Sequence, residues 1–173
     1  PGMMTTTEDT TLDAKGSLRQ LDCPPMQQAR TLNQRALLLQ SQAALSKDPE
    51  KKQNLLRQAS EAAKKAKAES PALYREVLAK HADSPAVLEA ALSLIKAAKS
   101  SDASKEEIKS WADTGAKIAK QYGSRYEADY NTQIATALLA TDDMEKLAVE
   151  FARRAEKALT PQNPETEEVK ARR

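Results

Sequence analysis

In four places a proline follows Asp, Ser or Asn, and these pairs divide the sequence into helices. The pairs are Asp48-Pro49, Ser70-Pro71, Ser84-Pro85 and Asn163-Pro164. The polar side chain can accept a hydrogen bond from a free backbone N–H of the first turn. Proline loses nothing at the first helical position, because the N–H that it lacks would have no partner there. Each pair therefore predicts the start of a helix.

Three further helix starts have the spacing of a capping box, in which a Ser or Asp N-cap lies three residues before Glu. They are Ser104 with Glu107, Ser124 with Glu127, and Asp142 with Glu145. Apolar residues between the starts recur at helical spacing. The sequence predicts helices at about 25–46, 49–69, 71–81, 85–99, 104–122, 125–140, 143–159 and from 164 to the end. The short loops make neighbours antiparallel, and Pro71 either begins a helix or kinks one long helix from 49 to 81.

Two of the predicted helices show signs of close packing. Residues 104–122 place Gly115 within the apolar stripe, which predicts that another helix approaches there. Residues 85–99 are apolar around most of the circumference, which predicts an inner helix covered on two sides. Tyr126 and Tyr130 share a face of the following helix, and we expect both as core anchors. With four glycines and few β-branched residues, the expected fold class is all-α.

The ends of the chain differ in character from its middle. Residues 1–22 have Thr clusters and little periodicity, and their opening "PGMM" is typical of a cloning remnant. We expect this segment to be a mobile leader. Residues 23–173 are expected to form a single helical domain. Its last residues, "ETEEVKARR", are helix-like without an ending signal, which indicates a fragment of a longer protein.

A similar pattern occurs twice, about 40 residues apart. The stretches are "AKHADSPAVLEAALSLIKAA" from residue 79 and "AKQYGSRYEADYNTQIATAL" from residue 119. Each has an Ala-Lys helix end, a serine cap and matching apolar positions, and on these residues the chain resembles the tetratricopeptide family of paired helices. The resemblance covers roughly residues 25–173 and implies antiparallel hairpins stacked as a right-handed α-solenoid. The family's aromatic and glycine positions are mostly absent, and the alternative is an irregular helical bundle.

The resemblance also implies a function and a binding face. In tetratricopeptide arrays the first helices line a concave face that receives peptides. The corresponding polar residues here are Glu89, Ser93 and Lys96 on one helix, and Glu127, Asn131 and Gln133 on the next. We therefore expect a non-catalytic protein-interaction or scaffold module that binds a protein or peptide partner. Short Ala-rich hairpins also resemble regions that precede thioredoxin-like domains in exported bacterial proteins, which implies an extracytoplasmic location.

Residues that suggest chemistry are few and isolated. His81, the single histidine, is expected to close a helix, where a cation or donor suits the helix C-terminus. Cys23 is the single cysteine and cannot form a metal site or an internal disulfide alone. The sequence has no phosphate-binding glycine loop, no HExxH and no nucleophile motif. We therefore expect no catalytic residues, no cofactor and no metal.

Charge leaves one alternative function open. The net charge of +2 is near balance, so no overall field attracts nucleic acid or membrane. Segment 47–80 is nonetheless rich in lysine, which makes nucleic-acid binding through it the alternative to protein binding. No apolar run has the 18 or more residues of a membrane span, and the small Ala surfaces disfavour binding to a lipid surface.

Overall fold

The computed structural model describes residues 10–12, 18–20 and 23–160. In chain order the elements are β1 (Thr10–Leu12), β2 (Leu18–Gln20), α1 (Pro24–Leu45), α2 (Pro49–Lys80), α3 (Ala86–Ala97), the short 3-10 helix η2 (Ala98–Ser100), α4 (Lys105–Gln121), α5 (Ser124–Leu139) and α6 (Glu145–Leu159). The predicted all-α class is confirmed for residues 23–160. The helix predicted from 164, and its start at Asn163-Pro164, lie outside the described residues.

The two short strands fall within the segment that the sequence marks as a leader. β1 and β2 pair antiparallel, with Thr10 opposite Gln20 and Leu12 opposite Leu18. The remainder of residues 1–22, for which mobility is expected, lies outside the described residues.

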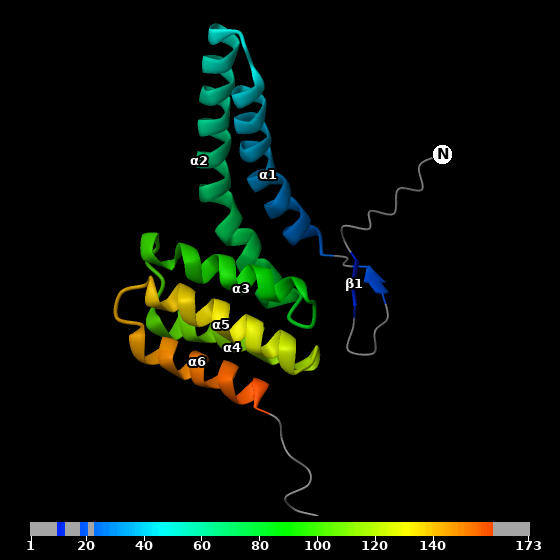
Figure 1. Cartoon of the computed structure of the whole chain (residues 1–173), viewed down its shortest axis with the longest axis vertical. Helices are drawn as coiled ribbons and strands as arrows, with labels where there is room; N and C mark the ends of the chain where they lie inside the picture. Colours follow the sequence, from blue (N-terminus) through cyan, green and yellow to red (C-terminus); the bar gives the residue numbers. More distant parts are fainter. Residues whose placement is uncertain (1–9, 13–17, 21–22, 161–173) are drawn as a thin grey trace, which may run out of the picture.

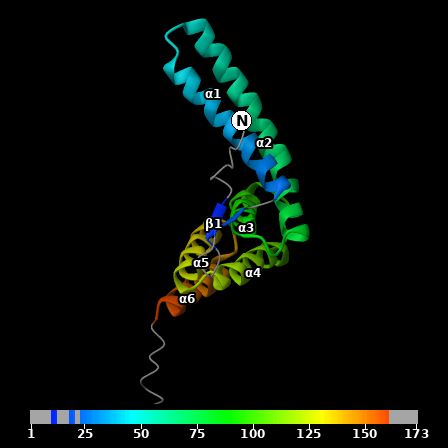
Figure 2. The same cartoon turned by 90° about the vertical axis from the view of Figure 1, so that its right-hand side faces the viewer.

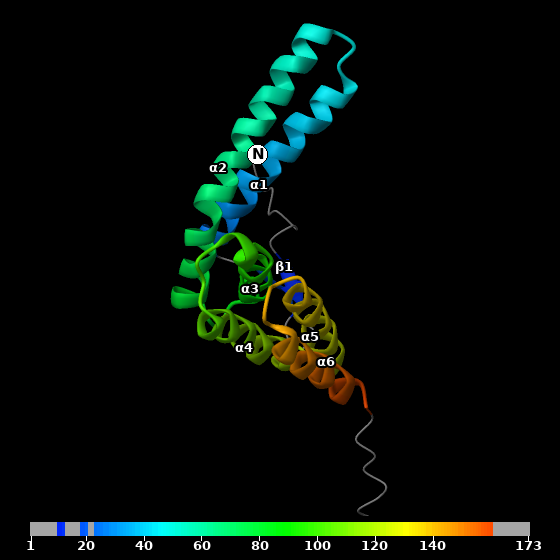
Figure 3. The same ribbon diagram turned by 90° about the vertical axis from the view of Figure 1, so that its left-hand side faces the viewer.

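The helices form two parts of different shape. A long hairpin of α1 and α2 stands on a compact group of α3, α4, α5 and α6 (Figure 1). The hairpin projects away from the group in the two perpendicular views as well (Figure 2, Figure 3). We call residues 24–69 the arm and residues 70–160 the body. The C-terminal part of α2 joins them, because α2 packs against both α1 and α3.

α2 is one continuous helix of 32 residues with Pro71 inside it. The prediction of a helix start at Ser70-Pro71 is therefore wrong, and the alternative of one long helix is correct. Contacts with α1 hold the helix around the proline: Asn33 Nδ2 donates to Ser70 Oγ at 3.4 Å and to Tyr74 Oη at 3.0 Å. Ser70 and Tyr74 are both buried. Tertiary packing here outweighs the local cost of a proline in a helix.

Two predicted helix starts are confirmed, and a third lies one residue later than predicted. Asp48 Oδ1 accepts hydrogen bonds from the backbone N–H of Glu50 at 2.9 Å and of Lys51 at 3.3 Å at the start of α2. Ser104 and Glu107 form both halves of a capping box on α4. At α3, Ser84 Oγ accepts from the backbone N–H of Ala86 at 3.2 Å, but the N-cap is Pro85 and the helix begins at Ala86.

Two predicted caps are wrong. α5 begins at Ser124 itself, with Gly123 as its N-cap at φ 102° and no side-chain cap. Glycine adopts a positive φ at little cost, so Gly123 forms the turn and Ser124 becomes the first residue of the helix. α6 begins at Glu145 after Met144, again without a side-chain cap. Asp143 has φ 60°, outside the helical range, so the residue after Asp142 cannot be the first of the helix.

The apolar core lies in the body and at the base of the arm. Its largest fully buried side chains include Phe151, Ile95, Ile118, Ile134 and Leu138. α3 packs against α2, α4 and α5, as expected for an inner helix covered on two sides. Fully burying one such side chain stabilises the fold by about 1.5–3 kcal/mol, so the body contains the main apolar stabilisation.

The predicted close approach at Gly115 is confirmed, and one tyrosine causes it. A Cβ atom at Gly115 would lie 1.8 Å from Tyr130 Oη, so only glycine leaves room for the ring. Tyr130 is buried and donates a hydrogen bond to the carbonyl of Ala112 at 3.2 Å. Tyr126 is 53% exposed, so its predicted role as a core anchor is wrong. It lies one turn earlier on α5, beside Tyr122, with 6.1 Å between ring centroids.

Candidate functional site

A groove lies in the angle between the arm and α3. It has a volume of about 690 Å³. It is lined by α1 between Asn33 and Gln40, by α2 between Ala63 and Tyr74, and by α3 and η2 between Glu89 and Ser100. We call it the junction groove. Three of the predicted partner-binding residues, Glu89, Ser93 and Lys96, line it together.

The floor of the groove is made of small side chains. Ala36, Ala63, Ala66 and Ala97 line it, and Ala36 and Ala66 are also buried residues of α1 and α2. Leu37 stands at the α1 side with 63% of its surface exposed. An exposed leucine beside a shallow alanine floor is an apolar surface available to a partner.

One end of the groove is fixed by hydrogen bonds of Asn33 on α1, some of which reach α2. Asn33 Nδ2 donates to the carbonyl of Ala29 at 2.8 Å and to Tyr74 Oη at 3.0 Å. These bonds satisfy the polar groups at the base of the arm. They also hold α1 and α2 in the relation that shapes the groove.

Of the charged residues that line the groove, one forms an ion pair within the described structure and two do not. Glu89 on α3 accepts from Arg30 on α1, with 2.6 Å between Nη2 and Oε2. Within the described part of the chain, Lys67 and Lys96 form no ion pair. Both lysines are exposed, so the groove presents two uncompensated positive charges around an apolar floor.

The second set of predicted residues does not join the first. Glu127 lines a different hollow, between the ends of α4 and α6 and the start of α5. Asn131 is buried, with 1% of its surface exposed, so it cannot contact a partner on the surface. Gln133 is exposed and donates to Asp129 at 2.9 Å. The expected strip on α5 is therefore wrong for Asn131, because α5 turns this position inward.

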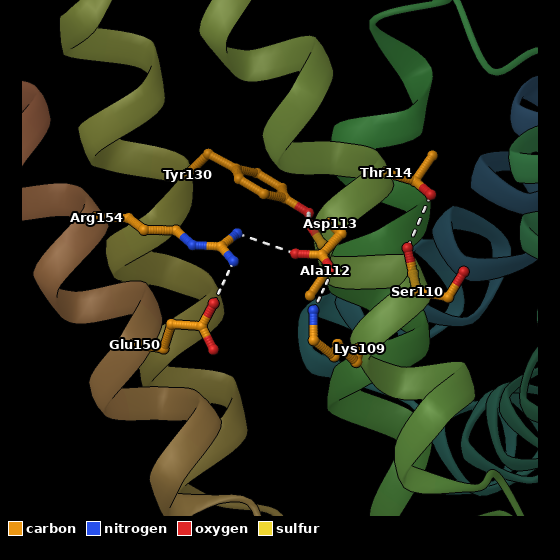
Figure 4. Close-up of polar contacts among 8 residues, drawn as sticks. All are labelled: Lys109, Ser110, Ala112, Asp113, Thr114, Tyr130, Glu150 and Arg154. Carbon is orange, nitrogen blue, oxygen red and sulfur yellow. Dashed lines mark hydrogen bonds and ion pairs between the residues drawn. The ribbon is translucent and has the colours of Figure 1, made fainter.

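A polar cluster joins α4, α5 and α6 within the body (Figure 4). Arg154 donates to Asp113 at 2.9 Å and also to Glu150, while Lys109 donates to Asp113. Burial alone raises the pKa of Asp113, but the hydrogen bonds and positive charges of Lys109 and Arg154 bring it below its ordinary value. Burial, and then the charge of Asp113, raises the pKa of Tyr130 above its ordinary value. The carboxylates pair with neighbouring cations, so the cluster holds α6 against α4.

The two isolated residues singled out by the sequence both lie at helix ends. His81 is the C-cap of α2, and its backbone N–H donates to the carbonyl of Val77 at 2.9 Å, as expected for a residue that closes a helix. Cys23 is buried in the core just before α1. Among the described residues, no group of His, Cys, Asp and Glu is arranged to hold a metal ion.

The contribution of α1 to the groove was missed by sequence reasoning, although a signal was present. The run Leu37-Leu38-Leu39 turns through about 100° per residue, so one helix face cannot bury all three leucines. At least one of them must point to solvent or to a partner. Leu37 and Leu38 are 63% and 59% exposed.

Comparison with family models, with curated proteins and with solved structures found no match for this chain. In residues 10–12, 18–20 and 23–160, no helix has both the length and the apolar character to cross a membrane.

Proposed function

We propose that this chain is a non-catalytic protein-interaction module that binds a segment of a partner protein in the junction groove. The observation that supports it most strongly is the groove itself. It combines an exposed Leu37, an alanine floor, and the polar residues Glu89, Ser93 and Lys96. A mainly apolar concavity with a few polar groups at its edge is the usual form of a peptide site.

The proposal includes a tetratricopeptide-like architecture for the body. α3 packs against α4 and α5, α4 packs against α5, and α5 packs against α6. A stack of helix pairs has these neighbour relations, since each pair contacts the next. The arm departs from the pattern, because α2 has 32 residues and extends beyond the body.

The test is selection of binding peptides from an unrestricted library displayed on phage, followed by affinity measurement with fluorescein-labelled peptides. Leu37→Asp should weaken binding at least about tenfold, or about 1.4 kcal/mol, because it places a charge at the apolar edge. Leu139→Asp is the matched control, since Leu139 is 65% exposed on α5 and lies outside the groove. Binding that survives Leu37→Asp, or a library that gives no binder, overturns the proposal.

A second candidate function is nucleic-acid binding by the arm. Residues 24–69 hold nine Lys and Arg against four Asp and Glu, a net charge of +5, whereas residues 70–160 hold thirteen against fourteen, a net charge of −1. The arm has no aromatic residue on which a base could stack, which favours the protein partner. Titration with labelled duplex and single-stranded oligonucleotides distinguishes the two, because phosphate binding weakens steeply as salt rises. No binding at low salt dismisses this candidate.

A further inference from the structure

The shape and surface of the junction groove indicate which backbone conformation fits it. The lining of α1 runs over two turns and that of α3 and η2 over about three, or roughly 10 Å and 16 Å at 1.5 Å per residue. At its base the amide of Asn33 is already engaged, since it donates to Ser70 and to Tyr74. An extended peptide on the alanine floor would find few partners for its backbone groups, whereas a helix satisfies its own. An amphipathic helix about three turns long, with large apolar side chains, suits such a floor.

The charged residues around the groove indicate the sign of the charge on the segment that it binds. Lys67 on α2 and Lys96 on α3 line the groove and form no ion pair with the described residues. Glu89, the acidic residue of the lining, is held by Arg30 at 2.6 Å. α1 contains no Asp or Glu along its whole length, Pro24–Leu45. Carboxylates on the occupant would therefore meet two available cations and no repulsion from α1.

We propose that the segment bound in the junction groove is an acidic amphipathic helix of a partner protein. Its apolar side chains lie on the alanine floor against Leu37, and its carboxylates lie beside Lys67 and Lys96. This inference rests on the proposed function and adds the conformation and charge of the partner segment. The lysines supply orientation and discrimination between partners more than total affinity, because rim charges act mainly in this way.

The experiment uses two peptide libraries with leucines at helical spacing and all other positions random, except for the flanking charges. One library has Glu at the flanking positions and the other has Lys. Binders are synthesised with both charge versions, and their affinities for the whole chain are measured by fluorescence anisotropy. The Glu version should bind at least about tenfold more tightly than its Lys twin.

Charge-exchange variants test whether the two lysines cause the preference. The double change Lys67→Glu and Lys96→Glu should reverse it, so that the Lys peptides bind more tightly. Lys64→Glu with Lys117→Glu is the control, because it makes the same change in net charge at exposed lysines outside the groove. The control should keep the preference for Glu peptides. Circular dichroism of each variant should show unchanged helix content.

The outcomes separate this inference from the proposed function. Peptides that require Leu37 but show no preference for Glu, or keep that preference in the double variant, overturn the acidic helix and leave the groove as the binding site. The same holds if only the unrestricted library gives binders that require Leu37. Peptide binding that is indifferent to Leu37→Asp overturns both proposals. A preference that the control variant also reverses shows a long-range charge effect and overturns the role of Lys67 and Lys96.

Discussion

Two asparagines of this chain occupy opposite hydrogen-bonding situations. Asn33 on α1 donates from Nδ2 to Ala29, Ser70 and Tyr74, at 2.8 to 3.4 Å. Asn131 on α5 is 1% exposed, and its Oδ1 has no hydrogen-bond partner among the described residues. A buried oxygen without a partner loses its hydration without compensation, at a cost of about 1–3 kcal/mol. The two positions therefore predict opposite responses to the same substitution.

We expect Asn131→Leu to leave the free energy of unfolding unchanged or to raise it by about 1 kcal/mol, because it removes the unsatisfied oxygen. Asn33→Leu, the same substitution at an exposed position, should lower it by about 1 kcal/mol, because it removes bonds that are made. Urea denaturation followed by circular dichroism measures both. A loss of stability at Asn131 as large as that at Asn33 would contradict the assignment, since it would show that Oδ1 has a partner.

The sequence predicts the packing of a single residue correctly where its position on the helix face is sufficient to determine it. Gly115 within an apolar stripe correctly indicated a close helix contact, because a glycine on the buried face of a helix leaves space that a neighbouring helix can fill. Tyr126 and Tyr130 could not be separated in this way, since positions four apart share a helix face. Only the three-dimensional arrangement places Tyr130 over Gly115 and leaves Tyr126 half exposed.

At the level of the helices, two predicted N-caps, Asp48 and Ser124, differ in structure. Asp48 accepts two backbone hydrogen bonds at the start of α2, whereas Ser124 lies inside the first turn of α5 without a cap bond. We expect Asp48→Ala to lower the free energy of unfolding by about 1 kcal/mol. Ser124→Ala should change it by no more than a few tenths. Thermal denaturation of the two variants compares them, and equal losses would refute the distinction.

The difference between these caps shows which helix starts can be predicted from local sequence alone. A cap followed directly by an exposed first turn, as at Asp48, depends on its own few residues. The sequence is then sufficient to predict where the helix begins. At Ser124 the preceding Gly123 takes φ 102° and moves the helix start. Near Asp142 the φ of 60° at Asp143 has the same effect, and α6 begins only at Glu145. These two departures depend on backbone conformation, which the spacing of a capping box does not determine.

The continuity of α2 depends on contacts that are distant in sequence. Asn33 bonds to Ser70 and Tyr74, which lie 37 and 41 residues further along the chain. These bonds support one continuous helix through Pro71. A local reading of Ser70-Pro71 therefore could not decide between a helix start and a helix interior.

At the level of the whole molecule, the projecting arm is the feature that sequence reasoning did not foresee. The sequence left open whether Pro71 begins a new helix or lies within one long helix, so the length of the hairpin was not determined. The junction groove exists because the arm stands at an angle to α3, so half of the site could not be predicted either. Glu89, Ser93 and Lys96 were predicted from the tetratricopeptide resemblance and share one helix face, a periodicity that needs no tertiary information.

The arm and the body should also differ in local stability. Between residues 36 and 66, the outer arm that lies away from the body, the buried side chains are the alanines Ala36, Ala43, Ala59 and Ala66. The body instead buries large side chains such as Ile95 and Phe151. Local opening is easiest where few apolar contacts hold a segment. Hydrogen exchange measured by mass spectrometry should therefore show amides of residues 38–58 exchanging at least about tenfold faster than those of residues 90–95.

The same measurement has an internal control and a clear contrary result. Residues 73–78 belong to the same helix as the outer arm but pack into the core through Tyr74 and Val77. They should exchange as slowly as α3, because protection follows burial rather than membership of a helix. Equal protection along the whole of α2 would contradict the expected gradient. It would mean that the alanine contacts between α1 and α2 stabilise the arm as strongly as the large apolar side chains stabilise the body.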